Sequence, residues 1–587
     1  MKEKKTKKES KISKATKFNI LAIFLIVIFC IAISPVTLQN DTYYTVKIGE
    51  YITNHGIDMQ DPFSWHEGLS YTYPHWLYDF LTYKIYSIAG FYGIYIITTL
   101  LACVLGVLIY KVNSKISKSE LVAFLVTIGS MYLLEGFIAA RAQLVTFIIF
   151  VLELFFIEKF LENKKIGYAI GLIILPILIA NLHCAVWPFY FVLFLPYVGE
   201  YVIAKLGDFI IYKKFKIKTL NLKIKKLSKK ENSQEKVEKI KNELQELEKR
   251  VEKIKQKREN ELKNPYKISI NKNENVKYLI IIMIICAFTG LLTPLGDTPY
   301  TYLSKTMQGN TTQNINEHLP MILINQVPVV CTLIVFLSIL TFTKTKIKLS
   351  DLFMLGGLCI LMLSSRRQLS MFTIICSVVL SRLMVNLTAE YEYEKDTLKK
   401  IRDKIASSVI ATIVLIAAVG GLSYYMGKDK IHQPIIDESS YPVQACDYIV
   451  NNIDLTKARF YNEYNYGSYM LFRNIPVFID SRADLYAPEF SGWKDDIFSD
   501  FINVSGLGEF YEDIFEKYGI THVICYRNSK INLVIIKSHD TNYNEIYVDN
   551  NFIIYERLNA NKEKTEEINS EDELKDIVEG NIEENNN

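Results

Sequence analysis

The stretch from Phe18 to Val36, FNILAIFLIVIFCIAISPV, contains 19 residues and no charged side chain. About 20 apolar residues are enough to cross the hydrocarbon core of a bilayer as a helix. Further blocks of this kind follow along the 587-residue chain, in which 50% of the residues are hydrophobic and 22% are charged. The sequence therefore predicts a polytopic membrane protein and excludes soluble cytosolic enzymes and secreted domains.

Eleven apolar segments predict membrane-spanning helices. They are 18–36, 91–112, 121–140, 144–162, 166–182, 187–205, 277–294, 327–343, 351–365, 369–387 and 407–426. The loops between them are alternately Lys-rich and Lys-poor, and Lys and Arg concentrate on the cytoplasmic side of a membrane. Residues 1–17 carry eight Lys and two Glu. We therefore predict a multi-pass protein of the cytoplasmic membrane, with its N-terminus inside and its C-terminal domain outside.

The same pattern divides the chain into regions. The predicted regions are a basic cytoplasmic tail (1–17), an N-terminal membrane domain (18–205) with a large first outer loop (37–90), a cytoplasmic insertion (206–275), a second membrane block (276–427), an extracytoplasmic α/β domain (428–558) and an acidic tail (559–587). Alternating helical and short apolar segments, with strands expected at 459–464, 468–473 and 477–479, indicate the α/β domain. The tail has ten acidic residues and three Lys, a composition typical of disorder.

The first outer loop predicts two helices at the membrane surface, at about 41–54 and 74–89. Asp41 lies close to the outer end of the first span. It is either a general base or metal ligand at the membrane surface, or the N-cap of the helix that follows. Asp61 is either a second acid of this site or the residue that opens the Asp-Pro turn. His75 either lines the site or packs at the interface beside Trp76.

Further charged and polar side chains fall at the outer ends of other predicted spans. They are Glu135, Arg141, His183, Glu317, Arg366 and Arg367. An ionisable residue at membrane depth is a functional candidate by default; the alternative for Glu135 is an ion pair with Arg141. Two adjacent arginines on the outer side oppose the positive-inside bias. They are suited to binding phosphate, although contact with lipid headgroups also explains them.

The cytoplasmic insertion contains a short heptad pattern. Its apolar positions, spaced 3, 4, 3, 4 and 3, are Val237, Ile240, Leu244, Leu247, Val251 and Ile254. This spacing is typical of a coiled-coil seam. Three structures remain open for residues 237–254: a homodimer zipper, one half of an intramolecular helical hairpin, or a solvated charged helix. The excess of Lys also suits contact with an anionic inner leaflet.

The nine cysteines give no zinc signal, because no two of them form a CxxC pair. A disulfide between Cys446 and Cys525, the two cysteines of the predicted outer domain, remains open. No feature of the sequence indicates a nucleic-acid partner.

This layout resembles the GT-C superfamily of membrane glycosyltransferases, in particular uncharacterised bacterial GT-C-like membrane proteins. The resemblance rests on Asp41 in the first outer loop, on Asp61-Pro62-Phe63-Ser64 with Pro74-His75-Trp76-Leu77, and on the segments 461–469 and 479–486. It covers most of residues 18–558, without the insertion.

The resemblance implies an enzyme that takes a sugar from a polyprenyl-phosphate-linked donor at the outer face and transfers it to an envelope glycan or protein. It places the catalytic acids at Asp41 and Glu135, with Asp61 nearby, and leaves a divalent cation, Mg or Mn, open at the first two. Substrate contacts are expected from Arg141, Arg366, Arg367, His75, His183 and Glu317. The partners would be the lipid-linked donor and membrane lipids. The competing hypotheses are a transporter or flippase of lipid-linked precursors, which would favour mid-span charges and internal repeats, and a non-catalytic membrane scaffold.

Overall fold

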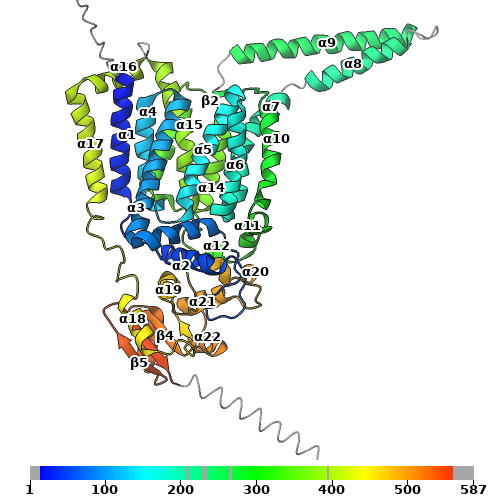
Figure 1. Cartoon of the computed structure of the whole chain (residues 1–587). Coiled ribbons are helices and arrows are strands. Elements are labelled where there is room, and N and C mark those ends of the chain that lie inside the picture. Colours follow the sequence, from blue (N-terminus) through cyan, green and yellow to red (C-terminus); the bar gives the residue numbers. More distant parts are fainter. Residues whose placement is uncertain (1–12, 207–209, 228–233, 264–266, 393–395, 559–587) are drawn as a thin grey trace, which may run out of the picture.

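The computed structural model describes residues 13–206, 210–227, 234–263, 267–392 and 396–558. A bundle of long helices forms one half of the molecule, and the C-terminal domain lies against one end of it (Figure 1). A helical hairpin projects from the opposite end. Most of the predicted basic tail, and the whole predicted acidic tail at 559–587, fall outside the described residues.

Long apolar helices build the bundle. They are α1 (Lys14–Ile33), α3 (Trp76–Ser117), α4 (Glu120–Leu133), α5 (Ala142–Asn163), α6 (Ile166–Leu182), η2 (Cys184–Leu193) with α7 (Leu195–Leu206), α10 (Val276–Ala287), α13 (Val327–Phe342), α14 (Leu349–Ser364), α15 (Leu369–Tyr391) and α17 (Val409–Gly427). Each predicted apolar segment falls on one of these helices. Among the described residues, five helices are long and apolar enough to cross a membrane, and several shorter apolar helices accompany them. The count of eleven spans stays a prediction.

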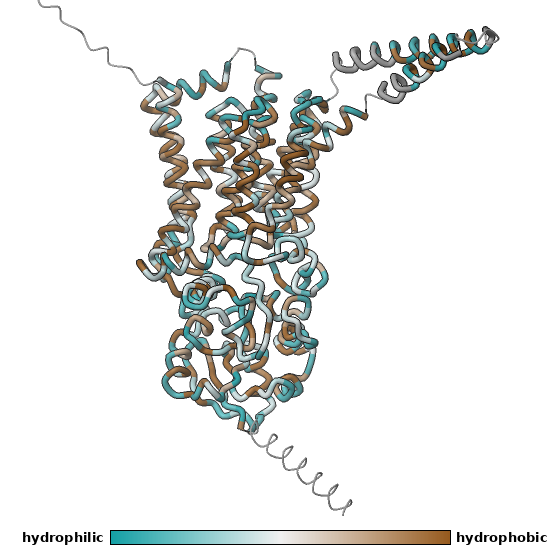
Figure 2. The backbone as a smooth tube through the Cα atoms, turned by 45° about the vertical axis from the view of Figure 1, so that its right-hand side comes forward, coloured by the Kyte–Doolittle hydropathy of each residue, from teal (hydrophilic) through white to brown (hydrophobic). Residues whose placement is uncertain are grey.

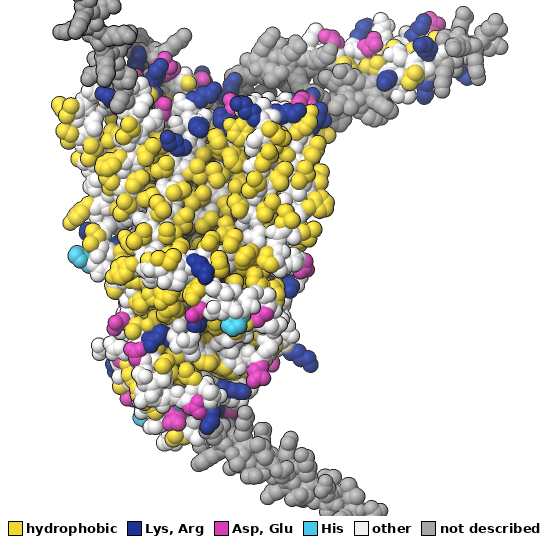
Figure 3. Space-filling view, in the orientation of Figure 1, with side chains coloured by type: hydrophobic (Ala, Val, Ile, Leu, Met, Phe, Trp, Pro, Cys, Tyr) yellow, Lys and Arg dark blue, Asp and Glu magenta, His cyan; other side chains and the backbone are white. Residues whose placement is uncertain are grey.

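The outer surface of the bundle is apolar. Its middle part is hydrophobic in every helix that Figure 2 shows, and a broad band of hydrophobic side chains covers the face drawn in Figure 3. Side chains such as Phe342, which is 84% exposed, and Ile410, which is 76% exposed, point away from the protein core. Soluble proteins rarely expose a continuous apolar surface of this size to water. The protein is therefore a membrane protein, as the composition predicts.

Two helical segments of the first loop lie across the end of the bundle: α2 and the part of α3 that precedes Gly90. Helix α2 spans Asn40–His55, and α3 breaks at Gly90, whose φ of +60° is unfavourable for any residue with a Cβ. The break separates the N-terminal part of α3 from its long apolar part, where the sequence predicts a helix end. Helix α2 packs against this N-terminal part so closely that a Cβ on Gly49 would lie 2.1 Å from the carbonyl oxygen of Asp79.

Short elements complete this end of the bundle. They are η1 (Glu135–Phe137), η3 (Thr289–Leu291), α11 (Thr298–Gln308), α12 (Thr311–Asn314), η4 (Leu323–Asn325) and η5 (Arg366–Gln368). At the opposite end, α16 (Thr397–Ser407) precedes α17, and β1 (Ile268–Ser269) pairs in parallel with β2 (Ile347–Lys348).

The C-terminal domain contains a four-stranded sheet in the order β3-β4-β6-β5. Strand β3 runs parallel to β4, and the other pairs are antiparallel. The strands are β3 (Phe460–Tyr461), β4 (His522–Tyr526), β5 (Tyr543–Val548) and β6 (Phe552–Arg557). The helices are α18 (Val443–Asn452), α19 (Tyr464–Phe472), η6 (Ala483–Tyr486), α20 (Pro488–Ser491), α21 (Ile497–Gly506), α22 (Tyr511–Tyr518) and α23 (Lys530–Ser538).

Two expected strands are absent from this sheet. Residues 468–473, which read as a strand in the sequence, belong to helix α19 or to the turn after it. The pattern is misleading because residues 466–471 are all buried, so no polar face marks the helical period. Residues 477–479 form an isolated bridge between Val477 and Ser64 of the first loop instead of a strand.

A shared hydrophobic core fixes the C-terminal domain on the first loop. Tyr43 of α2 is fully buried, and its ring contacts those of Tyr441, Tyr469 and Phe472 at 4.9–5.9 Å between centroids. Helix α2 was expected to rest on the membrane surface with one apolar stripe. It lies between α3 and α19 instead, and residues on both sides of it are buried. The first loop and the C-terminal domain therefore form one unit.

The insertion forms a hairpin of α8 (Ile210–Leu227) and α9 (Gln234–Lys263), which lie side by side (Figure 1). The heptad positions of α9 that the structure describes, Val237 to Val251, are half-buried or buried, and Leu220 of α8 is buried as well. The seam is therefore covered within the chain. Of the three open structures, this is the intramolecular hairpin.

Cys446 and Cys525, the two cysteines for which a disulfide was left open, are both free, buried thiols.

Candidate functional site

A cavity of about 1220 Å³ lies where the first loop, the end of the bundle and the C-terminal domain meet. Six of the predicted site residues line it: Asp41, His75, Arg141, His183, Glu317 and Arg367. They come from α2, from the residues that directly precede α3, α5 and η2, from the loop around residue 317 and from η5, far apart in the sequence. The packing of α2 and α19 brings Tyr464 and Arg482 of the C-terminal domain to the same wall.

Three charged side chains form a chain of ion pairs in this cavity. Arg141 Nε lies 2.9 Å from Asp41 Oδ2, and Arg141 Nη1 lies 3.1 Å from Glu317 Oε1. All three are partly exposed to the cavity, Asp41 by 20% and Glu317 by 39% of their side chains. Burial alone would raise the pKa of Glu317, but Arg141 and Arg367 hold that pKa below its ordinary value. Glu317 is therefore ionised at neutral pH.

Arg367 is a cation at the cavity wall with a free guanidinium group. Its backbone N–H donates to the carbonyl of Glu317 at 2.9 Å, which fixes the residue at the start of α15. Within the described part of the chain, its half-buried side chain has no ion pair and no hydrogen bond. Burial and the charge of Arg367 together lower the pKa of the neighbouring His318, so this histidine is neutral at pH 7. Arg367 can therefore accept an anion from the cavity.

A buried carboxylate orients one of the cavity histidines. Asp79 is fully buried, and its oxygens lie 2.7 and 2.8 Å from His75 Nδ1. On the other side of the ring, His75 Nε2 lies 3.1 Å from the hydroxyl of Tyr44, which lines the cavity one helical turn after Asp41. Nδ1 therefore carries the proton, and Nε2 accepts from Tyr44 when the imidazole is neutral. Burial lowers the pKa of His75, but Asp79 more than offsets this and raises it overall.

Three predicted site residues lie elsewhere. Glu135 does not line the cavity, and Lys430 Nζ binds its carboxylate at 2.7 Å. The expected pairs Asp41–Glu135 and Glu135–Arg141 are therefore both absent, because Lys430 and Glu317 take the places of the expected partners. Arg366 also lies outside the cavity lining, and its Nε donates to the carbonyl of Pro320 at 3.4 Å.

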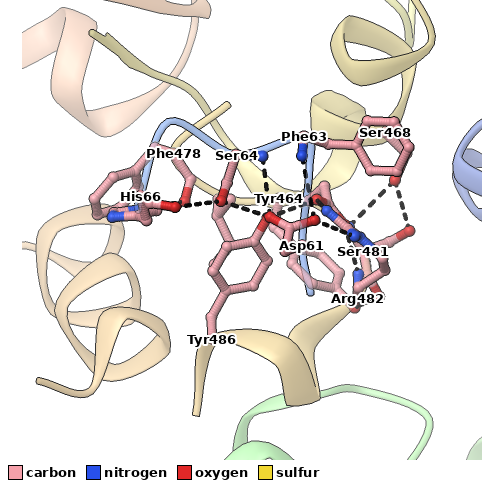
Figure 4. Close-up of polar contacts among 12 residues, drawn as sticks. Asp61, Phe63, Ser64, His66, Tyr464, Ser468, Phe478, Ser481, Arg482 and Tyr486 are labelled. Carbon is pink, nitrogen blue, oxygen red and sulfur yellow. Dashed lines mark hydrogen bonds and ion pairs between the residues drawn. The ribbon is translucent and has the colours of Figure 1, made fainter. Parts of the chain in front are cut away.

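Asp61 is a structural residue in this fold. Its side chain is fully buried, and Arg482 Nη1 donates to Asp61 Oδ1 at 2.7 Å (Figure 4). Arg482 also binds both oxygens of Asp480, at 2.9 and 2.7 Å, and the hydroxyl of Tyr486 donates to Asp480 at 2.6 Å. This network connects the first loop to the C-terminal domain. The ion-pair explanation of the Asp480-Ser481-Arg482 segment agrees with these contacts, and a catalytic role for Asp61 does not.

Asp41 does not cap α2. The N-cap residue is Gln39, and Asp41 lies in the first helical turn. Its Oδ1 atom has no hydrogen-bond partner among the described residues. This oxygen is available to a ligand in the cavity while Oδ2 holds Arg141.

The donor set of the cavity does not fit a metal ion. No group of three or more His, Cys, Asp or Glu side chains is placed to hold one within the described ranges. Asp41 and Glu135, the expected ligands, lie in separate ion pairs with Arg141 and Lys430. We therefore derive no step through Mg or Mn.

Sequence reasoning missed Asp79 and Tyr44. Asp79 follows His75 by four residues in a segment predicted to be helical, and this spacing places two side chains on one helical face. That signal was present in the sequence. Nothing local to Tyr464 or Arg482 could place them at the cavity, because their position depends on how the C-terminal domain docks.

The arrangement defines a class of membrane protein: a helical bundle with a first-loop acid, and a C-terminal domain closing a cavity over it. Among solved structures, the chain is similar to the Archaeoglobus fulgidus oligosaccharyltransferase in the apo form, with a TM-score of 0.52 and 11% identity over 86% of this chain and 69% of that one. It is also similar to the same enzyme tethered to an acceptor peptide, with a TM-score of 0.48, 11% identity and the same coverage. No family model and no curated protein matches the sequence. The first similarity shows the fold, and the GT-C fold predicted from the sequence is confirmed.

Proposed function

We propose that this protein is a GT-C-type glycosyltransferase that transfers a sugar from a polyprenyl-phosphate-linked donor to an envelope glycan or protein at the outer face of the membrane. One observation carries the proposal. The cavity at the end of the apolar helical bundle brings together the carboxylate of Asp41 and the guanidinium of Arg367; within the described ranges, Asp41 Oδ1 and the side chain of Arg367 have no polar partner. These groups suit the activation of an acceptor and the departure of a phosphate.

The reaction has two requirements that this cavity addresses. The bond between the anomeric carbon and the donor phosphate breaks, and its electron pair leaves with the phosphate. Arg367, whose charge has no partner in the described structure, stabilises the growing negative charge there. The acceptor loses a proton as its oxygen or nitrogen bonds to the anomeric carbon. Asp41 Oδ1 accepts the proton that the acceptor group loses.

Aromatic side chains in the cavity wall support a sugar ligand. Tyr44, Tyr71, Tyr302, Tyr464 and Phe490 line the cavity. Their rings are held by neighbouring elements; the hydroxyl of Tyr464, for instance, donates to the carbonyl of Ser481 at 3.1 Å. Aromatic faces and polar tips in one wall suit a ligand that has both apolar C–H faces and hydroxyl groups.

Arg367 and Arg366 give a matched pair for testing this proposal. We expect Arg367→Gln to weaken binding of a polyprenyl monophosphate by about tenfold or more, since a hydrogen bond to a charged group contributes roughly 1.5–3 kcal/mol. Arg366→Gln should bind it normally, because Arg366 does not line the cavity and its Nε already donates to the carbonyl of Pro320. Native mass spectrometry of the purified variants with the polyprenyl monophosphate measures the dissociation constant of each. Equal binding by Arg367→Gln and the wild type would refute the assignment of the phosphate site.

The proposed orientation in the membrane has its own test. Dark blue Lys and Arg side chains gather at the end of the bundle from which the hairpin projects (Figure 3), as the positive-inside rule expects for a cytoplasmic end. We expect an impermeant maleimide to label Glu509→Cys in intact cells and to leave Gln245→Cys on α9 unlabelled until the cells are opened. Both positions are exposed in the structure. Labelling of Gln245→Cys in intact cells would reverse the orientation.

A further inference from the structure

The hairpin of α8 and α9 is uneven in charge. Helix α8 carries seven Lys and no acidic residue, whereas α9 carries eight Lys, two Arg and eight Glu. A helical hairpin that only needed to be soluble would not require this asymmetry. The acidic residues of α9 also compensate α8 at the contact between them, where Lys216 Nζ lies 3.1 Å from Glu243 Oε1.

The side of α8 away from α9 carries exposed charged and apolar side chains. Leu220 is 7% exposed on the side that faces α9, whereas Leu222 is 55% exposed. Two residues correspond to about 200° around a helix, so Leu222 lies on the opposite side from Leu220. Lys218 lies one turn before Leu222, and Lys223 follows it. Both lysines are exposed, and neither has an ion pair within the described residues.

The chain from Lys267 onward, which follows the hairpin, is fixed at the Lys-rich end of the bundle. Lys267 Nζ donates to the carbonyls of Leu340 and Thr341 at 2.9 Å, at the end of α13. The backbone N–H of Asn271 donates to Glu200 Oε1 at 2.8 Å, at the end of α7. The hairpin extends sideways from this end of the molecule, with α8 nearer the bundle than α9 (Figure 1).

We propose that α8 lies on the cytoplasmic surface of the surrounding bilayer and binds anionic lipid headgroups. Lys218 and Lys223 contact lipid phosphates, and Leu222 enters the headgroup layer, which is how basic amphipathic helices bind membranes. This inference does not depend on the proposed transferase activity, because the cavity lies at the other end of the bundle. It explains why α8 has no acidic residue and why, among the described residues, no element covers Leu222, Lys218 and Lys223.

Spin labels on the full-length protein in nanodiscs test this proposal. One label is placed at Leu222→Cys and a control label at Gln245→Cys on α9, in a background in which the exposed Cys331 is replaced by Ser. Power saturation compares collisions with oxygen, which concentrates in the bilayer, and with a water-soluble nickel chelate. In discs that contain phosphatidylglycerol, we expect the label at Leu222→Cys to be shielded from nickel and the label at Gln245→Cys to remain accessible.

Two comparisons identify what covers α8. In discs of phosphatidylcholine alone, the shielding at Leu222→Cys should be largely lost. The double variant Lys218→Gln, Lys223→Gln should lower the equilibrium constant for docking of α8 on anionic discs by about 25-fold. Each lysine near an anionic surface contributes about 1 kcal/mol, or about fivefold. The line shape of the Gln245→Cys label shows that the hairpin is still folded.

Three results would overturn the proposal. Equal nickel access in anionic and neutral discs would exclude anionic lipid as the partner. Shielding in detergent that rises with protein concentration would identify a second copy of the chain instead. Shielding that inorganic phosphate produces in neutral discs would identify a free anion.

Discussion

Replacing Asp41 with Asn is expected to lower glycosyl transfer by about a hundredfold or more, the usual contribution of a positioned general base. Asn keeps the size of the side chain and can still accept a hydrogen bond, but it has no charge to attract the acceptor proton. The ion pair with Arg141 holds the wild-type carboxylate in place through Oδ2 and leaves Oδ1 available to a ligand. The loss should therefore appear in kcat more than in donor binding.

The same substitution should cost little stability. Asp41 is not the N-cap of α2, and its ion pair with Arg141 is partly exposed. Exposed pairs contribute about 0.2–1 kcal/mol, and an acid in the first turn of a helix contributes about 0.3–1 kcal/mol. Purified wild-type and Asp41→Asn protein, given a lipid-linked sugar and compared for rate and melting temperature, separate the two effects.

Glu135→Gln is the matched control. Glu135 was expected beside Asp41, but it binds Lys430 outside the cavity. We expect this variant to transfer sugar at nearly the wild-type rate. Wild-type rates in Asp41→Asn would refute the catalytic assignment and favour the scaffold hypothesis, which predicts that loss of Asp41 is tolerated.

The fold could be predicted because its signals are local. Uncharged runs and the alternation of Lys along the loops are visible in one pass through the sequence. The break at Gly90 was also predictable, since glycine commonly ends helices. The strand predicted at residues 468–473 failed for the opposite reason: a helix buried on all sides has no polar face to show its period.

Most of the charged residues that line the cavity could be predicted from the sequence, but the ion pairs between them could not. Depth in the membrane and residue type identified Asp41, Arg141, Glu317 and Arg367 as candidates. Their pairing depends on which helix ends are neighbours, and this is decided by packing over long sequence distances. Glu317 therefore took the place expected of Glu135. Likewise, the sequence alone is consistent with a catalytic role for Asp61, because only the docking of the C-terminal domain places Arg482 beside it as an ion-pair partner.

Replacing Arg482 with Gln is expected to lower the free energy of unfolding by about 3–5 kcal/mol, the usual effect of removing one partner of a buried ion pair. Arg482 is 2% exposed in its side chain, and it neutralises two carboxylates that are fully buried, Asp61 and Asp480. Without it, both charges stay buried without a cation. Because Asp61 belongs to the first loop and Asp480 to the C-terminal domain, the loss should separate these two parts.

Thiol reactivity and melting temperature measure this separation. Cys446 and Cys525 are buried in the C-terminal domain, so their reaction with a maleimide reports its opening. Arg473→Gln is the control, because Arg473 pairs with Asp447 at an exposed position and should cost about 1 kcal/mol or less. Equal melting temperatures for the Arg482→Gln and Arg473→Gln variants would show that the buried network does not hold the domain.

The pH dependence of stability gives an independent check on the same network. Burial alone would raise the pKa of Asp61, but Arg482 holds it below its ordinary value. A carboxyl with a lowered pKa in the folded state contributes stability that is fully present above its unfolded pKa, about 3.9, and is lost as the pH falls through the folded value. The wild type should therefore lose stability in acid below about pH 4. In the Arg482→Gln variant the buried carboxyl of Asp61 loses this cation, so burial should instead raise its pKa above that of the unfolded chain. The variant's deficit relative to the wild type should then narrow as the pH falls, and a deficit that stays constant from pH 7 to pH 4 would contradict an electrostatic role for Arg482.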